Sequence, residues 1–157
     1  MKSRLNIFKA APDVVKAMLG VEEALAAGSI ESSLLKLVKL RASQINGCAY
    51  CIHMHVKEAI KAGETNMRIH MLSAWRESPL FSERERAALA WTEALTQIAQ
   101  TGAPDTDYEP VEAQFNEEEI GYLTLMIGAI NLWNRVQIGL RGIHPVEAND
   151  RPVQQVA

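Results

Sequence analysis

The chain has 157 residues, of which 48% are apolar and 22% are charged, and its net charge is −3. This length suits one ordinary domain with its own core, and the composition is that of a soluble globular protein. Because there is no basic excess to neutralise phosphates, we expect no nucleic-acid partner. The two cysteines, Cys48 and Cys51, are too few for a disulfide-scaffolded secreted mini-protein. We therefore expect a single domain over residues 1–157.

The N-terminal segment has no apolar run of the length that a signal peptide needs. The stretch 120–134 carries no charged residue, but polar side chains interrupt it, and a bilayer span needs about 20 mostly apolar residues. We therefore expect a cytoplasmic protein with no membrane partner.

Apolar residues recur at spacings of three and four along almost the whole chain, a period that is typical of amphipathic helices. Two capping boxes, Ser82 with Glu85 and Asn116 with Glu119, mark the beginnings of the last two long helices. No segment has the alternating pattern of a strand, so the expected fold class is all-α. The expected helices cover, in chain order, about residues 12–27, 34–46, 48–62, 65–75, 82–98, 110–115 and 116–140.

Gly, Pro, Asp and Thr are concentrated in residues 102–109, and this composition predicts the one clear loop of the domain. Residues 142–157 contain Pro145 and Pro152 and follow the last helical pattern. We expect them to form a tail that is loose or docked on a partner.

The last expected helix is apolar on two faces. One stripe contains Leu123, Ile127 and Ile130, and the other contains Leu125, Ala129, Leu132 and Val136. A helix that is apolar all round is buried on all sides, either as the central helix of a monomer or at a subunit contact. The spacing leaves both open, and we expect a homo-oligomer that covers the second stripe.

The segment 44–55 contains both cysteines and two of the four histidines. On a helix, residues at i, i+3 and i+7 share one face, so Cys48, Cys51 and His55 line up while His53 points elsewhere. Cys48 also lies near the first turn of the expected helix, where unpaired N–H groups and the helix dipole favour a thiolate.

The position of His55 distinguishes the two sulfurs. It lies one helical turn after Cys51 but about 10 Å along the helix axis from Cys48, so its imidazole can meet only the Cys51 sulfur. We therefore expect Cys51 to be the nucleophile, His55 its activating base and Cys48 the resolving thiol. A peroxide oxidises a thiolate to a sulfenic acid, which condenses with a neighbouring thiol to a disulfide, and this spacing suits that cycle.

Other interpretations of these residues stay open. A metal site would combine Cys48, Cys51 and His55 with a fourth ligand such as His70 or His144, but one CxxC without a matched pair is weak support for it. A purely structural disulfide is unusual in a cytosolic chain, and two ordinary buried cysteines would have no chemistry. We expect neither a metal nor a cofactor.

Four segments of the chain resemble the alkylhydroperoxidase D (AhpD)-like branch of the carboxymuconolactone decarboxylase family, over about residues 14–141. They are KLVKLRASQINGCAYCIHMHVKEAIKAGE (36–64), LSAWRE (72–77), ERERAALAW (83–91) and NLWNR (131–135). The resemblance implies an all-helical fold that assembles as trimers or hexamers. It also implies thiol-dependent reduction of a hydroperoxide by Cys51, with Cys48 resolving, His55 in a proton relay, and an external dithiol of thioredoxin or lipoyl type as reductant.

The family pattern is incomplete in this chain. Lys36 stands where the family has the relay glutamate, and Tyr50 stands where some members carry a relay histidine. Loss of general acid–base help costs typically 10²–10⁴-fold in rate. As a hypothesis, turnover is therefore lower than in members that keep the glutamate. Glu58, three residues past His55, is a candidate to accept from the imidazole, and Glu31 and Glu93 are more distant ones.

The leading hypothesis is thus a thiol peroxidase that protects against hydroperoxides. The family name allows a carboxymuconolactone decarboxylase-type enzyme as an alternative, although that chemistry does not need a redox-active CxxC. A third alternative is a non-catalytic thiol redox sensor whose proton relay has degraded, which Lys36 makes plausible.

Overall fold

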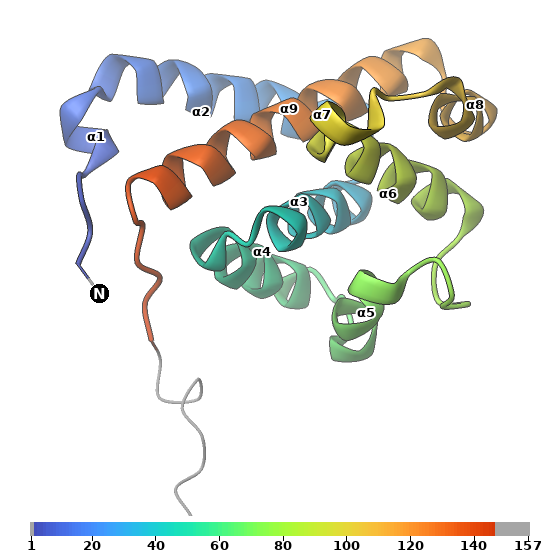
Figure 1. Ribbon diagram of the computed structural model, residues 1–157, viewed down its shortest axis with the longest axis horizontal. Helices are drawn as coiled ribbons and strands as arrows, with labels where there is room; N and C mark the ends of the chain where they lie inside the picture. The colour runs from blue at the N-terminus through green and yellow to red at the C-terminus, as the bar shows by residue number, and fades with distance from the viewer. Residues whose placement is uncertain (1, 147–157) are drawn as a thin grey trace, which may run out of the picture.

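The longer helices of the chain form where the sequence supplies an apolar stripe. The structure, a computed structural model, describes residues 2–146, and this part of the chain contains no strand (Figure 1). The all-α prediction is therefore confirmed. In chain order the helices are α1 (Ile7–Ala10), α2 (Pro12–Ala26), α3 (Ser32–Asn46), α4 (Ala49–Lys61), α5 (Asn66–Met71), the 3₁₀ helix η1 (Leu72–Ala74), α6 (Glu83–Thr96), α7 (Ile98–Thr101), α8 (Asp105–Gln114) and α9 (Glu117–Gly139).

Helix α3 lies at the centre of the fold and packs against α4, α6 and α9. Its side chains enter two separate clusters of buried residues. Leu34, Leu35 and Val38 join one cluster with residues of α6, α8 and α9, whereas Leu37 and Leu40 join the other with residues of α4, α5 and α6. Because α3 contributes to both clusters, it holds α4 in a fixed position relative to α2 and α9.

The turn between α3 and α4 sets the position of the first cysteine. Gly47 has a φ of +69°, in the left-handed region that a residue without Cβ adopts at little cost, and it ends α3. The backbone N–H of Cys48 then donates to the carbonyl of Ser43 at 3.0 Å, and Cys48 becomes the N-cap residue of α4.

A buried amide network holds the end of α3 against α9. The Nδ2 of Asn46 donates to the side-chain oxygens of Asn131, at 2.9 Å, and of Asn134, at 2.8 Å. The Nδ2 of Asn134 donates in turn to the hydroxyl of Ser43 at 3.1 Å. The polar side chains of α9 are therefore paired with those of α3 and support the turn that carries Cys48.

Asn134→Ala is expected to lower the free energy of unfolding by about 2 kcal/mol, because it deletes a fully buried side chain together with its hydrogen bonds to Asn46 and Ser43. Chemical denaturation monitored by circular dichroism measures the loss. Gln100→Ala removes an exposed amide outside the network, and we expect it to change stability by less than about 0.5 kcal/mol. Equal effects of the two substitutions would contradict the assigned role of the network.

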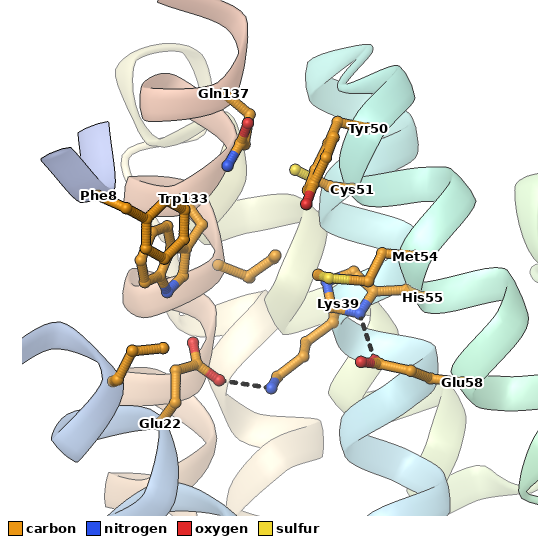
Figure 2. A pocket seen from close by; sticks show the side chains of 12 residues that line it. Phe8, Glu22, Lys39, Tyr50, Cys51, Met54, His55, Glu58, Trp133 and Gln137 are labelled. Atoms are coloured by element: carbon orange, nitrogen blue, oxygen red, sulfur yellow. Dashed lines mark hydrogen bonds and ion pairs between the residues drawn. The ribbon is translucent and has the colours of Figure 1, made fainter. Parts of the chain in front are cut away.

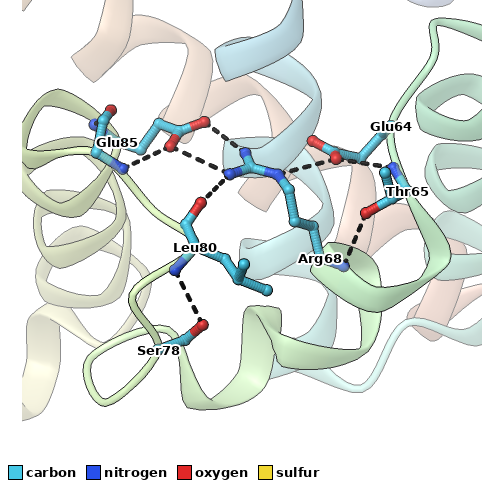
Figure 3. A network of polar contacts seen from close by, with 7 residues as sticks. Glu64, Thr65, Arg68, Ser78, Leu80 and Glu85 are labelled. Carbon is cyan, nitrogen blue, oxygen red and sulfur yellow. Dashed lines mark hydrogen bonds and ion pairs between the residues drawn. The ribbon is translucent and has the colours of Figure 1, made fainter.

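The connection from α4 to α6 is fixed by Arg68 on α5 (Figure 3). Its guanidinium pairs with Glu64 Oε1 at 2.9 Å and with Glu85 Oε1 at 2.5 Å, and it also donates to the carbonyl of Leu80. Glu85 belongs to the capping box of α6, which the structure confirms together with the box of Asn116 and Glu119 at α9.

Two predicted boundaries were wrong, and one short helix was not predicted. The loop predicted over 102–109 is helical from Asp105, because acidic residues in the first turn favour the helix N-terminus and Val111 packs into the core, which outweighs the missing N–H of Pro110. The helix predicted to reach residue 98 stops at Thr96, and a separate short helix follows. Helix α1 has only four residues, too few for a periodic signal.

The two apolar stripes of α9 have different surroundings. Leu123, Ile127 and Ile130 are buried in the described chain, whereas Leu125 is 65% exposed and Leu132 is 46% exposed. Ala129 and Val136 of the second stripe are half-buried, so this stripe is only partly covered within the described chain, and the burial of the rest in a homo-oligomer stays a prediction.

Residues 142–146 follow α9 without regular structure, and the expected tail beyond them, 147–157, lies outside the described residues. Among residues 2–146, no helix combines the length and the apolar character that crossing a membrane requires.

Candidate active site

Cys48 and Cys51 are joined as a disulfide at the beginning of α4, with their Cα atoms 5.3 Å apart. The Cys48 sulfur also accepts a hydrogen bond of 3.3 Å from the backbone N–H of Cys51, as an N-cap side chain does. Both residues are buried, and both lie where the unpaired N–H groups of the first turn favour a negatively charged sulfur. The pair is therefore able to form a disulfide within the first turn of α4.

His55 lies one turn further along α4 and is held by Glu58. The imidazole is 3% exposed, and its Nδ1 lies 2.9 Å from Glu58 Oε2. Because an ionised carboxylate can only accept, Nδ1 carries the hydrogen that points to Glu58. No group among the described residues forms a hydrogen bond to the other ring nitrogen, the buried Nε2, which therefore has an open position.

Glu58 is ionised at neutral pH. The hydrogen bond from His55 lowers the pKa of the Glu58 carboxyl, and the positive charges of Lys39 and Lys36 lower it further, while partial burial acts in the opposite direction. The orienting partner of the histidine is therefore a carboxylate over the whole range in which an imidazole works as a base.

A cavity of about 270 Å³ opens beside these groups, bounded by α1, α2, α3, α4 and α9 (Figure 2). Cys51 and His55 line it, whereas Cys48 does not. Its apolar lining consists of Phe8, Leu19, Met54, Ile130 and Trp133, and its other polar lining residues are Glu22, Lys39, Tyr50, Glu58 and Gln137. A small molecule in this cavity meets the second sulfur of the motif and not the first.

Of the residues predicted to modulate the site, Tyr50 and Glu58 line the cavity and Lys36 does not. The ammonium of Lys36 bonds to the hydroxyl and carbonyl of Ser32 instead, so only its charge acts on Glu58. Lys39, one turn further along α3, lines the cavity, and its Nζ lies 2.6 Å from Glu22 Oε2 on α2. Sequence reasoning missed this ion pair because its members come from separate helices with no shared motif.

The more distant glutamates are engaged elsewhere. Glu31 forms an ion pair of 2.9 Å with Arg84, and Glu93 forms one of 2.7 Å with Arg41 and accepts from the Trp75 indole at 2.8 Å. Neither glutamate lines the cavity beside Cys51.

The remaining histidines do not join the site. His70 is exposed on α5, and His144 stacks on His53 with ring centroids 4.7 Å apart. Within residues 2–146, no three His, Cys, Asp or Glu side chains are grouped so as to hold a metal ion.

Comparison with known proteins gives a consistent set of relatives. The model of the carboxymuconolactone decarboxylase family matches residues 12–94. The Bacillus subtilis protein YdfG is 40% identical over 140 residues, which cover 89% of this chain and 95% of YdfG.

Solved structures show the same fold. A protein of unknown function from Agrobacterium tumefaciens, for which a role in antioxidant defence as AhpD has been suggested, superposes with a TM-score of 0.90 at 49% identity and covers 93% of this chain and 100% of its own. The debrominase Bmp8, solved with 2,3,4-tribromopyrrole, superposes with a TM-score of 0.79 at 20% identity, over 91% of this chain and 75% of its own. At that identity the likeness concerns the fold alone.

Proposed function

This chain belongs to the carboxymuconolactone decarboxylase family, and from that membership we propose that it is a thiol-dependent hydroperoxide reductase with Cys51 as the attacking thiol. The observation that carries the proposal is the cavity, which Cys51 lines and Cys48 does not. A peroxide that enters it meets one sulfur, and the disulfide to Cys48 is the product that follows if that sulfur is oxidised.

The proposed cycle has three steps. The Cys51 thiolate attacks the terminal oxygen of the hydroperoxide, an S–O bond forms, the O–O bond breaks, and the alkoxide leaves as an alcohol after taking a proton. The Cys48 thiolate then attacks the Cys51 sulfur, the S–S bond forms, and the hydroxide leaves as water with a proton. An external dithiol of thioredoxin or lipoyl type returns two electrons and becomes a disulfide itself.

His55 and Glu58 supply the proton transfers of this proposal. With Nδ1 engaged by Glu58, the open Nε2 accepts the thiol proton of Cys51 and then returns it to the leaving alkoxide. Tyr50, whose phenol lines the same cavity, is a second proposed donor. Glu58 thus takes the part that the family gives to a glutamate at the position of Lys36.

In this proposal the protein works in the cytoplasm, where dithiol reductants remain available. It acts as a homo-oligomer, a trimer or a hexamer. The exposed Leu125 and Leu132 on α9 support an assembly, because subunit contacts cover apolar stripes of this kind.

One equivalent of hydroperoxide added to the reduced protein tests the proposal. We expect both thiols to disappear within seconds, the intact mass to fall by two hydrogens, and one equivalent of alcohol to form. A decarboxylase-type enzyme would leave its thiols unchanged under these conditions, so thiols that stay reduced at neutral pH would refute the proposal. A thiol sensor would form the disulfide but would not turn over when dithiothreitol and excess peroxide are supplied.

A further inference from the structure

The cavity beside Cys51 has a charged end (Figure 2). In Figure 2 the Cys51 sulfur and Tyr50 lie toward one end of the labelled side chains, and Glu22 with Lys39 lies toward the other. The two charged side chains are 20% and 17% exposed, and their 2.6 Å ion pair joins α2 to α3. The wall of the cavity therefore contains Lys39, whose positive charge is already paired with the carboxylate of Glu22.

A second carboxylate acts on the same lysine. Glu58 also lines the cavity, and the charge of Lys39 is among the causes that lower the pKa of Glu58. The lining that the structure describes thus sets two glutamates, Glu22 and Glu58, against a single Lys or Arg side chain, Lys39. An anion that enters this space loses its hydration and meets no unpaired cation.

We propose that this charge arrangement restricts the site to uncharged aryl or alkyl hydroperoxides and excludes those that bear a carboxylate, with Glu22 as the specificity-determining residue. The inference rests on the proposed function, since it concerns the substrate of the same thiol. The uncharged carbon body lies against Met54 and Trp133, and the peroxide group lies at Cys51, which takes the terminal oxygen while the alcohol leaves with a proton.

Two peroxides with one skeleton test the inference, namely cumene hydroperoxide and its para-carboxylate. The rate of Cys51 oxidation in the reduced protein is measured for each by rapid quenching and mass spectrometry, and is divided by the rate with free dithiothreitol to remove intrinsic reactivity. At pH 7.5 we expect the carboxylate to react roughly tenfold more slowly with the wild type, from charge repulsion at low effective dielectric constant.

Glu22→Gln removes the carboxylate that pairs directly with Lys39 and leaves one glutamate and one lysine in the lining, so we expect the tenfold ratio to fall to about threefold or less. Glu23→Gln is the matched control: it makes the same charge change at an exposed neighbour on α2 and is expected to keep the wild-type ratio. Lys39→Met removes the cation and is expected to widen the ratio, so the test does not depend on one variant.

Equal normalised rates in the wild type, or a ratio that neither Glu22→Gln nor Lys39→Met changes, would overturn this inference and leave the proposed function standing. If neither peroxide oxidises Cys51, the proposed function itself is refuted, and the inference with it.

Discussion

Cys51→Ser is expected to lower the rate of oxidation by hydroperoxide on the order of 10³-fold or more, because a serine hydroxyl is not ionised at neutral pH and does not attack the peroxide. Cys48→Ser is expected to keep the first step within about threefold of the wild-type rate, since Cys48 does not line the cavity. Its product should be a protein that is heavier by one oxygen and reacts with dimedone, with no internal disulfide.

Cys48→Ser is also a structurally conservative change. Cys48 caps α4 through its sulfur, and a serine hydroxyl accepts the same hydrogen bond from the N–H of Cys51. The helix should therefore begin at the same residue, and both variants should melt near the wild-type temperature. If Cys51→Ser were the variant that forms a sulfenic acid and Cys48→Ser the inert one, the two roles would have to be exchanged.

The arrangement of side chains along α4 was predictable because it depends on one helix. Residues at spacings of three and four share a face, so the sequence alone placed Cys51 and His55 on one face and made Glu58 a candidate partner of the imidazole. The structure confirms the His55–Glu58 hydrogen bond. The roles of these residues in catalysis stay predictions.

The cavity could not be predicted in the same way. Its lining comes from five helices, and the ion pair of Glu22 with Lys39 depends on how α2 packs beside α3. Nor does a helical pattern distinguish Lys36 from Lys39 as the lysine that reaches the cavity. The first half of helix α8 was missed for a related reason, since packing of the helix through Val111 outweighed a composition that favours a loop over residues 102–109.

Glu58→Gln is expected to slow the oxidation of Cys51 roughly 10²-fold at pH 7, because an amide neither fixes the Nδ1–H tautomer of His55 nor stabilises the imidazolium that forms when the thiol loses its proton. The effect requires an ionised carboxylate in the wild type. The hydrogen bond from His55 lowers the pKa of Glu58 below its ordinary value of 4.5, so this carboxylate stays ionised down to that pH and is protonated only in more acidic solution.

A change in folding is easily separated from this effect. The side chain of Glu58 is 48% exposed, so Glu58→Gln should unfold at close to the wild-type denaturant concentration. Lys36→Gln is the matched control, because it also introduces an amide near Glu58 but at a side chain that does not line the cavity. We expect its oxidation rate to stay within about threefold of the wild type. A loss of rate in Lys36→Gln as large as that in Glu58→Gln would mean that local charge, and not the hydrogen bond to His55, governs the thiol.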